Sequence, residues 1–163
     1  MAIRNIVKKG DDVLRKICRT QMNFDERLAT VLDDMAETMY KANGCGLAAS
    51  QIGILRRVCI VDVGDGLIEL INPVITEKSG SQTGSEGCLS VPNRYEEVTR
   101  PMQVTVRAQN RNGENFVIKA EGLKARALCH EIDHLDGIIY TDKVIKKLTP
   151  EEAQNFRSQK KGE

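Results

Sequence analysis

The only two histidines of this 163-residue chain lie four residues apart, in the sequence HEIDH at positions 130–134. Positions four apart share one face of a helix, so His130 and His134 can both reach a single metal ion. Glu131 lies beside that face, close enough to act on a water molecule at the metal. The spacing indicates a hydrolytic metal centre, although two histidines exposed on a helix would also satisfy it.

A catalytic centre of this kind needs a third protein ligand and one open position. One class of proteases places a third histidine six residues after the second, but here that residue is Tyr140, so the third ligand must be Cys, Asp or Glu. Cys129 points off the metal face of the helix and is predicted to be a buried hydrophobic side chain. Cys88 differs, because it lies in SEGCLSVP (85–92), a loop-like stretch between predicted strands. Its thiolate could complete the ligand set.

A third segment, GCGLAASQ at positions 44–51, is built mainly of small residues. Such residues allow the backbone to approach a ligand closely, but a tight connection packed by small side chains explains them equally well. Gln51 at its end could present an amide N–H to an oxygen atom that gains negative charge.

The elements that must position these residues follow from periodicity and turn signals. Asp25 is a good N-cap, and the apolar spacing of residues 28–39 predicts an amphipathic helix that Gly44 ends. A second helix is expected over residues 123–136 and a short third one over residues 150–159, behind a capping box. Between them, strands are expected at 57–63, 67–71, 74–77, 95–99, 102–108 and 115–120.

These elements predict an α+β fold in a single domain, residues 1–163, with a frayed tail at 157–163. Mixed or antiparallel β-sheets would pack around a central metal-binding HExxH helix, with an N-terminal amphipathic helix and a short C-terminal one. The 24 basic and 23 acidic residues balance to a net charge of +1, which does not indicate a nucleic-acid or anionic-membrane partner. The longest apolar run is residues 58–61, and no secretory signal is visible, so a cytoplasmic protein is expected.

In their order along the chain, GCGLAASQ, EGCLS and HEIDH resemble the three signature motifs of the peptide deformylase family. The resemblance extends to GDDVLR at positions 10–15 and to the strand-rich middle, so that it covers nearly the whole chain. It implies an enzyme that hydrolyses the N-formyl group from the initiator methionine of new polypeptides and releases formate. It also implies one divalent metal ion, usually Fe²⁺, although Zn²⁺, Ni²⁺ or Co²⁺ can occupy such a site.

The resemblance assigns roles to individual residues of this chain. Cys88, His130 and His134 become the metal ligands, and Glu131 becomes the general acid and base. Gln51 and the backbone N–H of Leu89 become the donors to the developing oxyanion. The substrate-binding residues that it implies, together with our own expectation for the methionine pocket, are Gly46, Glu86, Gly87, Leu123 and Ala127.

Three positions depart from a simple apolar pocket or from the family pattern. Arg126 lies one turn before the first histidine, and we expect its stem to pack along the pocket wall with its charge in solvent. Several family members have a substrate-holding arginine seven residues after the ligand cysteine, where this chain has Tyr95 and places Arg94 one residue earlier. Cys45 is expected to line the site.

Two other functions remain alternatives at this point. An HExxH metallopeptidase would use an acidic third ligand, whereas a structural metal site would hold Cys88, His130 and His134 together with a fourth protein ligand. The expected partner is a nascent polypeptide that begins with formyl-methionine, with neither a membrane nor a specific nucleic acid. Contact with the ribosome is a suggestion based on the basic residues of the C-terminal part, Lys146, Lys147, Arg157, Lys160 and Lys161.

Overall fold

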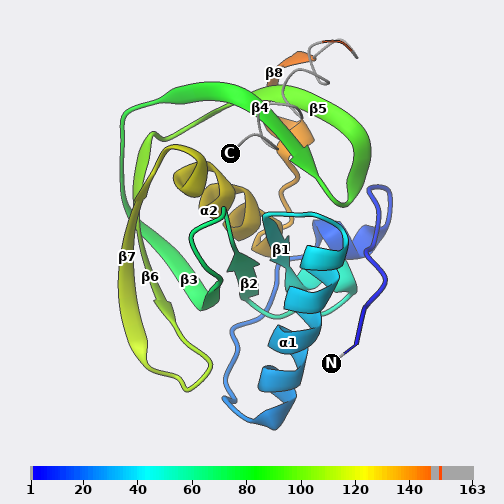
Figure 1. The fold of residues 1–163 in the computed structure, drawn as a ribbon, viewed down its shortest axis with the longest axis vertical. Coiled ribbons are helices and arrows are strands. Elements are labelled where there is room, and N and C mark those ends of the chain that lie inside the picture. The colour runs from blue at the N-terminus through cyan, green and yellow to red at the C-terminus, as the bar shows by residue number, and fades with distance from the viewer. Residues whose placement is uncertain (1, 148–150, 152–163) are drawn as a thin grey trace.

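The computed structural model describes residues 2–147 and 151, and within them a run of antiparallel strands lies between two long helices (Figure 1). The strands are β1 (Gly46–Ala48), β2 (Val58–Val61), β3 (Ile68–Ser79), β4 (Gln82–Cys88), β5 (Val91–Arg100), β6 (Gln103–Gln109), β7 (Asn115–Glu121) and β8 (Val144–Lys147). The helices are α1 (Glu26–Lys41) and α2 (Gly122–Leu135), with short 3-10 helices at Asp12–Arg15, Ala49–Ile52 and Tyr140–Lys143. The predicted combination of helices with antiparallel sheets is confirmed.

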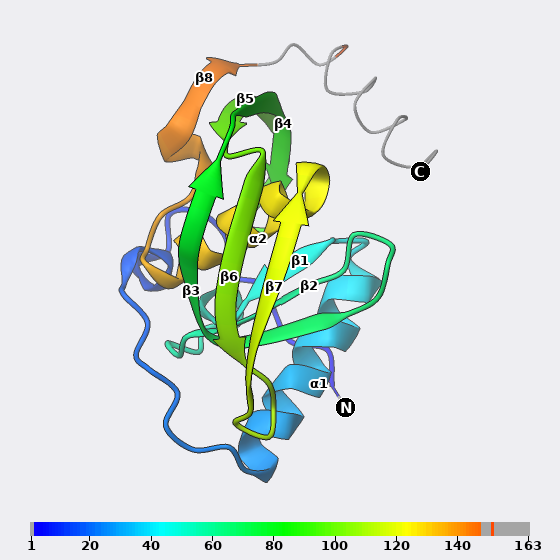
Figure 2. The same ribbon diagram turned by 90° about the vertical axis from the view of Figure 1, so that its left-hand side faces the viewer.

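The described strands form two sheets, one in the order β1-β2-β3-β6-β7 and the other in the order β4-β5-β8. Figure 2 shows β3, β6 and β7 side by side, with α2 behind them. Helix α2 contacts strands of both sheets, β1, β2, β6 and β7 of the larger and β5 of the smaller. It therefore lies in the interior, where both sheets can present residues to it.

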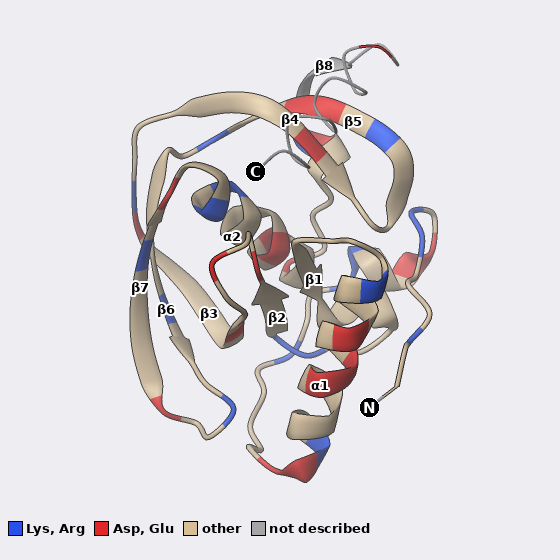
Figure 3. Ribbon diagram, in the orientation of Figure 1, with Lys and Arg blue, Asp and Glu red and all other residues tan. Residues whose placement is uncertain are grey.

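Helix α1 begins after Asp25, whose carboxylate accepts a hydrogen bond from the backbone N–H of Leu28 at 3.1 Å. Its apolar side is buried against β1 and β2, while acidic residues occur along its length (Figure 3). The helix ends at Lys41, and the residue in the left-handed conformation is Asn43 (φ 57°), not Gly44 as expected. Asparagine tolerates this conformation. Gly44 has a different role, because a Cβ there would lie 2.7 Å from Cδ1 of Leu89.

Strand β3 corrects the prediction of two strands at 67–71 and 74–77, since it runs without a break from Ile68 to Ser79. Its pairing with β6 shifts register between Ile71 and Val74, where Asn72 adopts a left-handed φ of 51°. Pro73 has no N–H to donate at this point. The side chain of Asn72 compensates with hydrogen bonds to Gln21 and Gln109, so the chain bulges and continues as a strand.

The stretch at 85–92 also differs from the prediction, because it is a tight hairpin and not a loop. Strand β4 continues to Cys88, Leu89 and Ser90 form the turn, and β5 begins at Val91. Cys88 is directly paired with Val91 across this turn. Glycine and serine weaken the local strand signal, and pairing with β5 overrides it. The pairing with β5 fixes the position of the Cys88 backbone.

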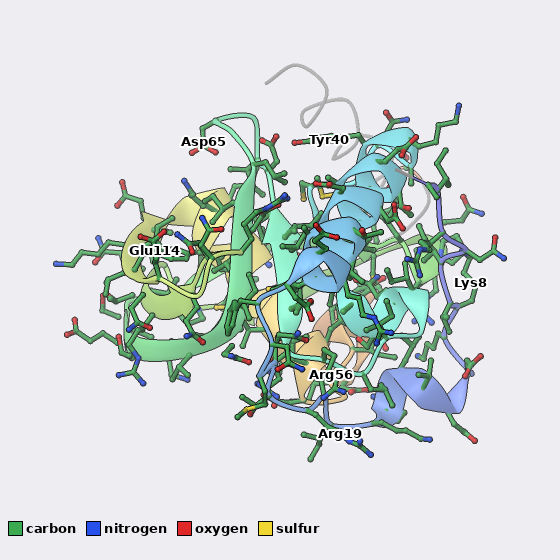
Figure 4. The ribbon with its side chains drawn as sticks, turned by 90° about the horizontal axis from the view of Figure 1, so that it is seen from below. Lys8, Arg19, Tyr40, Arg56, Asp65 and Glu114 are labelled. Carbon is green, nitrogen blue, oxygen red and sulfur yellow. The ribbon has the colours of Figure 1, made fainter. Side chains whose placement is uncertain are left out.

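The chain segment before α1 pairs with the segment before β2. Arg19 and Arg56 form an isolated parallel bridge, and their side chains lie near one another at the lower edge in Figure 4. No helix among the described residues is both long enough and apolar enough to cross a membrane. The helix expected at residues 150–159 and the tail at 157–163 fall outside the described residues, apart from residue 151.

Candidate metal centre

The structure brings together three residues that are far apart in the sequence. The ligand atoms of Cys88, His130 and His134 all lie within 4.8 Å of one another. Sγ of Cys88 is 3.3 Å from Nε2 of His134. Cys88 comes from the end of β4, and both histidines come from one face of α2. A thiolate and two imidazoles form a donor set that suits Zn²⁺ or Fe²⁺.

The orientation of His130 is set by Glu86. Nδ1 of His130 lies 2.7 Å from Oε1 of Glu86, which leaves Nε2 directed toward the centre, 4.0 Å from Oε2 of Glu131. Glu86 itself is held by the guanidinium of Arg100 at 2.8 and 2.9 Å. Burial would raise the pKa of Glu86, but its hydrogen bonds with Arg100 and His130 lower that pKa well below its ordinary value. A carboxylate behind a histidine in this way fixes both its tautomer and its orientation.

Glu131 is buried, and one of its carboxylate oxygens, Oε1, has no hydrogen-bond partner among the described residues. Burial raises the pKa of this carboxyl to about 7. A buried polar atom without a partner is costly and is usually explained by a water molecule, an ion or a catalytic role. The donor set and this carboxylate together fit a divalent metal ion, which would supply Lewis acidity beside Glu131.

Gln51 lies in the 3-10 helix that follows β1, close to Sγ of Cys88. Its Oε1 accepts a hydrogen bond from the backbone N–H of Ala48 at 2.9 Å, which fixes the amide. Its Nε2 is thereby directed toward Oγ of Ser90 at 3.0 Å and toward Sγ of Cys88 at 3.5 Å. The amide N–H group therefore faces the centre with little freedom to rotate.

The close approach that the small residues of 44–51 allow occurs at Gly46. A Cβ on Gly46 would lie 2.4 Å from Oε2 of Glu131, well inside van der Waals contact. The backbone of β1 therefore passes directly beside the unpartnered carboxylate. This arrangement brings three segments of the chain, 46–51, 86–90 and 130–134, to one place.

Comparison with known proteins agrees with this geometry. The sequence model of the family described as "Polypeptide deformylase" matches residues 3–150. This chain belongs to the polypeptide deformylase family. Polypeptide deformylases are metal-dependent hydrolases that remove the N-formyl group from nascent peptides.

Individual relatives cover almost the full chain. A peptide deformylase of Acetivibrio thermocellus is 55% identical over 161 residues, which are 99% of this chain and 95% of the relative. One of Alkaliphilus metalliredigens is 56% identical over 147 residues, 90% of this chain and 100% of the relative. The crystal structure of peptide deformylase from Thermotoga maritima is 40% identical and superposes with a TM-score of 0.87, covering 88% of this chain and 99% of that one.

Within this candidate site of the deformylase-family chain, Arg126 contradicts the expectation that its charge lies in solvent. Arg126 is only 6% exposed, and its Nη1 lies 2.7 Å from Oε2 of Glu86. The physical reason is that β4 and β5 cover α2 at this point, and their carboxylate and carbonyl oxygens replace water around the guanidinium. Glu86, expected to face the substrate, has both carboxylate oxygens engaged by His130, Arg100 and Arg126.

The other expected pocket residues lie around the same helix and hairpin. Leu123 and Ala127 are on α2, with Leu123 half-buried and Ala127 6% exposed. Gly87 lies on β4, where a Cβ would lie 2.6 Å from Cε1 of Tyr95, so the tyrosine ring packs against the hairpin. Arg94 is paired with Glu96 through two of its guanidinium nitrogens.

Sequence reasoning missed several residues that contact the candidate ligands or the groups around them. Arg100 bridges Glu86 and Asp133, and no local signal marked it. Asp133 and Ser90 lie inside the motifs and carry polar groups, which could have singled them out. The ring of Tyr140 stacks on His130 with centroids 5.7 Å apart. Tyr140 stands where some proteases have a third histidine ligand, and here it packs against His130.

Proposed function

We propose that this chain hydrolyses the N-formyl amide of formyl-methionine at the start of new polypeptides, releasing formate. The observation that carries the proposal is the unpartnered Glu131 carboxylate beside the converging ligand atoms of Cys88, His130 and His134. We take α2 as the metal-binding HExxH helix of the fold and these three residues as the ligands of one divalent ion. Such an ion supplies Lewis acidity, which acidifies water and polarises a carbonyl group.

Glu131 is the proton carrier of the proposed reaction. Its carboxylate accepts a proton from the attacking water and returns it to the amine that leaves. Its buried position, with Oε2 4.0 Å from Nε2 of His130, places the carboxylate for both tasks. Gly46 keeps the space for the carboxylate open, because any side chain there would displace it.

Two N–H donors serve the carbonyl oxygen as it gains negative charge. The amide of Gln51 is oriented by Ala48 and Ser90, and its second N–H, directed at Sγ of Cys88 at 3.5 Å, is the one that would turn to the carbonyl oxygen. The backbone N–H of Leu89 follows the ligand cysteine in the β4–β5 turn. Loss of one such donor typically costs a factor of about 10²–10³ in rate.

The substrate's position follows from a free strand edge. Within the described residues β1 has a sheet neighbour, β2, on one side only, and Glu131 lies against the face of β1 at Gly46. An extended peptide can pair with such an edge through its backbone, which requires no particular sequence. The methionine side chain would then enter a pocket formed by Leu123 and Ala127 on α2 and by Gly87 on β4, with Cys45 at its border.

Fe²⁺ is our choice for the native metal, with Zn²⁺, Ni²⁺ and Co²⁺ as ions that the same ligands can hold. The partner is the nascent chain, and the place of action is the cytoplasm, where translation provides it. Contact with the ribosome through the basic C-terminal residues belongs to the same proposal. Of these residues, Arg157, Lys160 and Lys161 lie outside the described part of the chain.

The first experiment is formate release from formyl-Met-Ala-Ser by protein purified without oxygen, beside Glu131→Gln, with metal content measured in both. We expect activity in the wild type and a loss of about 10²–10⁴-fold in the variant, with the metal retained. A folded, fully metallated wild type that releases no formate would exclude deformylation.

Cys88→Ala separates the metallopeptidase from the proposal, and the activities of the wild type and Glu131→Gln separate the structural metal site from it. A metallopeptidase with an acidic third ligand would keep its metal in this variant, whereas the proposed site loses it. A structural metal would leave the wild type inactive and make Glu131→Gln indistinguishable from it. The cluster of three ligand atoms among the described residues, without a fourth within the same 4.8 Å, supports an open catalytic site.

A further inference from the structure

Arg126 makes a set of contacts that a pocket-wall residue does not need. Its Nη1 donates to Oε2 of Glu86 at 2.7 Å, to the carbonyl oxygen of Val98 at 3.1 Å and to that of Gly84 at 3.4 Å. Gly84 and Val98 are directly paired residues of β4 and β5. One guanidinium on α2 therefore ties the helix that carries His130 to the hairpin that carries Cys88.

Glu86 contacts the side chains on both sides of this connection. Its Oε1 contacts Nδ1 of His130 and Nη2 of Arg100, while its Oε2 contacts Nε of Arg100 and Nη1 of Arg126. Arg100 is shared, because its Nη1 also lies 2.6 Å from Asp133. Arg126 is the cation that approaches Glu86 from α2, on the oxygen opposite the histidine.

Three cations surround two anions in this cluster. Glu86 is paired with Arg100 and Arg126, and Asp133 is paired with Arg100 and with Lys143 at 3.2 Å. Without Arg126, Oε2 of Glu86 would keep only Nε of Arg100, which also holds Asp133 through Nη1, so the carboxylate would be held less firmly against His130. Burying a second arginine carries a desolvation cost, and an apolar residue of the same volume would often be equally stable. Its benefit is therefore expected in orientation more than in stability.

We propose that Arg126 is a positioning residue of the metal centre, which acts through Glu86 to hold His130 at the correct distance from the Cys88 thiolate. The inference rests on the proposed function in one respect, that Cys88, His130 and His134 are the metal ligands. Partners that orient a metal-binding histidine typically change metal affinity by about 10–100-fold when they are removed. Arg126 acts one step further out than Glu86, so an effect of about tenfold is expected.

The test compares Co²⁺ affinity among three variants and the wild-type protein, all prepared metal-free and titrated against a competing chelator. Arg126→Met keeps the apolar stem but removes the guanidinium. Arg126→Lys keeps the positive charge but lacks the planar set of N–H donors of a guanidinium. The matched control is Arg57→Met, since Arg57 binds the other end of α2, at the carbonyl oxygen of Leu135 (3.1 Å) and at Asp136 (2.9 Å). The visible spectrum of the bound Co²⁺ reports ligand geometry independently of activity.

We expect Arg126→Met to weaken Co²⁺ binding by about tenfold and to shift the Co²⁺ spectrum. Arg126→Lys should recover part of the affinity, and Arg57→Met should match the wild type. A folded Arg126→Met protein whose affinity stays within about twofold of the wild type overturns the proposal. If Arg126→Met does not fold, Arg126→Lys decides in the same way, with unchanged affinity against the proposal and weakened affinity for it. Normal Co²⁺ binding without formate release from the wild type would refute deformylation and leave this inference standing.

Discussion

Replacing Gly46 by alanine should inactivate the enzyme without removing its metal. Gly46 lies outside the left-handed backbone region, so alanine introduces no backbone strain. The added Cβ would lie 2.4 Å from Oε2 of Glu131, 2.8 Å from its carboxyl carbon and 2.9 Å from Cγ, against an ordinary contact of 3.4 Å or more. Rotation of the carboxylate alone cannot relieve three contacts, so the whole side chain must move by about 1 Å.

A displacement of about 1 Å at a reacting group can cost about 10²-fold in rate, which corresponds to about 2.7 kcal/mol of barrier. The assay is kcat for formate release, measured with metal content and with the midpoint of thermal unfolding. The ligands Cys88, His130 and His134 are untouched, so the metal should remain. Overpacking should lower the free energy of unfolding by about 1–3 kcal/mol.

Gly84→Ala is the control, because its Cβ would meet the nearest atom, Nη2 of Arg126, at an ordinary 3.4 Å. It adds the same methyl group to the same region without displacing Glu131, so kcat should stay within about twofold. The reasoning is refuted if Gly46→Ala retains wild-type kcat. It is also refuted if the loss of activity follows loss of metal, since Gly46 would then act on the ligands and not on the carboxylate.

Two further predictions concern stability. The hydrogen bonds of Asp34 with Ala2 and Arg4 lower its pKa below the ordinary 3.8, so its contribution is complete above about pH 4 and is lost as pH falls through the lower folded value. Asp34→Asn should therefore reduce the loss of unfolding free energy as the pH falls below about 4. The same pH dependence in Asp34→Asn and the wild type, measured by unfolding at acid pH, would argue against this. Asn72→Ala should lower the free energy of unfolding by about 2–4 kcal/mol, because it removes three side-chain hydrogen bonds at a left-handed φ of 51°. Denaturant titration measures the loss, and Asn72→Gly as control retains the φ and should lose less.

The centre combines a rigid part and an adaptable part. Cys88 lies at the end of a strand that is paired up to the turn, and both histidines lie on one buried helix, so the ligands have little freedom. The edge of β1 near them is unpaired within the described residues, and we propose that it pairs with the backbone of different peptides. This division suits an enzyme that acts on one common group at the start of many different chains.

Local sequence patterns were sufficient to predict the two long helices, one of which carries both histidines. The Asp25 cap and the apolar spacing of residues 28–39 indicate a helix, and the structure has α1 at Glu26–Lys41. The expected helix at 123–136 corresponds to α2, within one residue at each end. These signals are local, because caps and helical periodicity involve residues only three or four positions apart. The HEIDH spacing belongs to the same class, so the pairing of His130 with His134 could be derived without a fold.

The tertiary structure alone decided which partners these residues meet. The β4–β5 hairpin replaced an expected loop, since pairing across strands outweighs the weak local preference of SEGCLS. Glu86 and Arg126 are 40 positions apart, and neither shows in the sequence that its charge is neutralised by the other. A buried charge is tolerated only where the fold supplies its partners, and those partners come from distant segments. The sequence alone therefore determined the reacting groups and the helix that carries both histidines, and the packing of α2 against the hairpin determined how these groups are held.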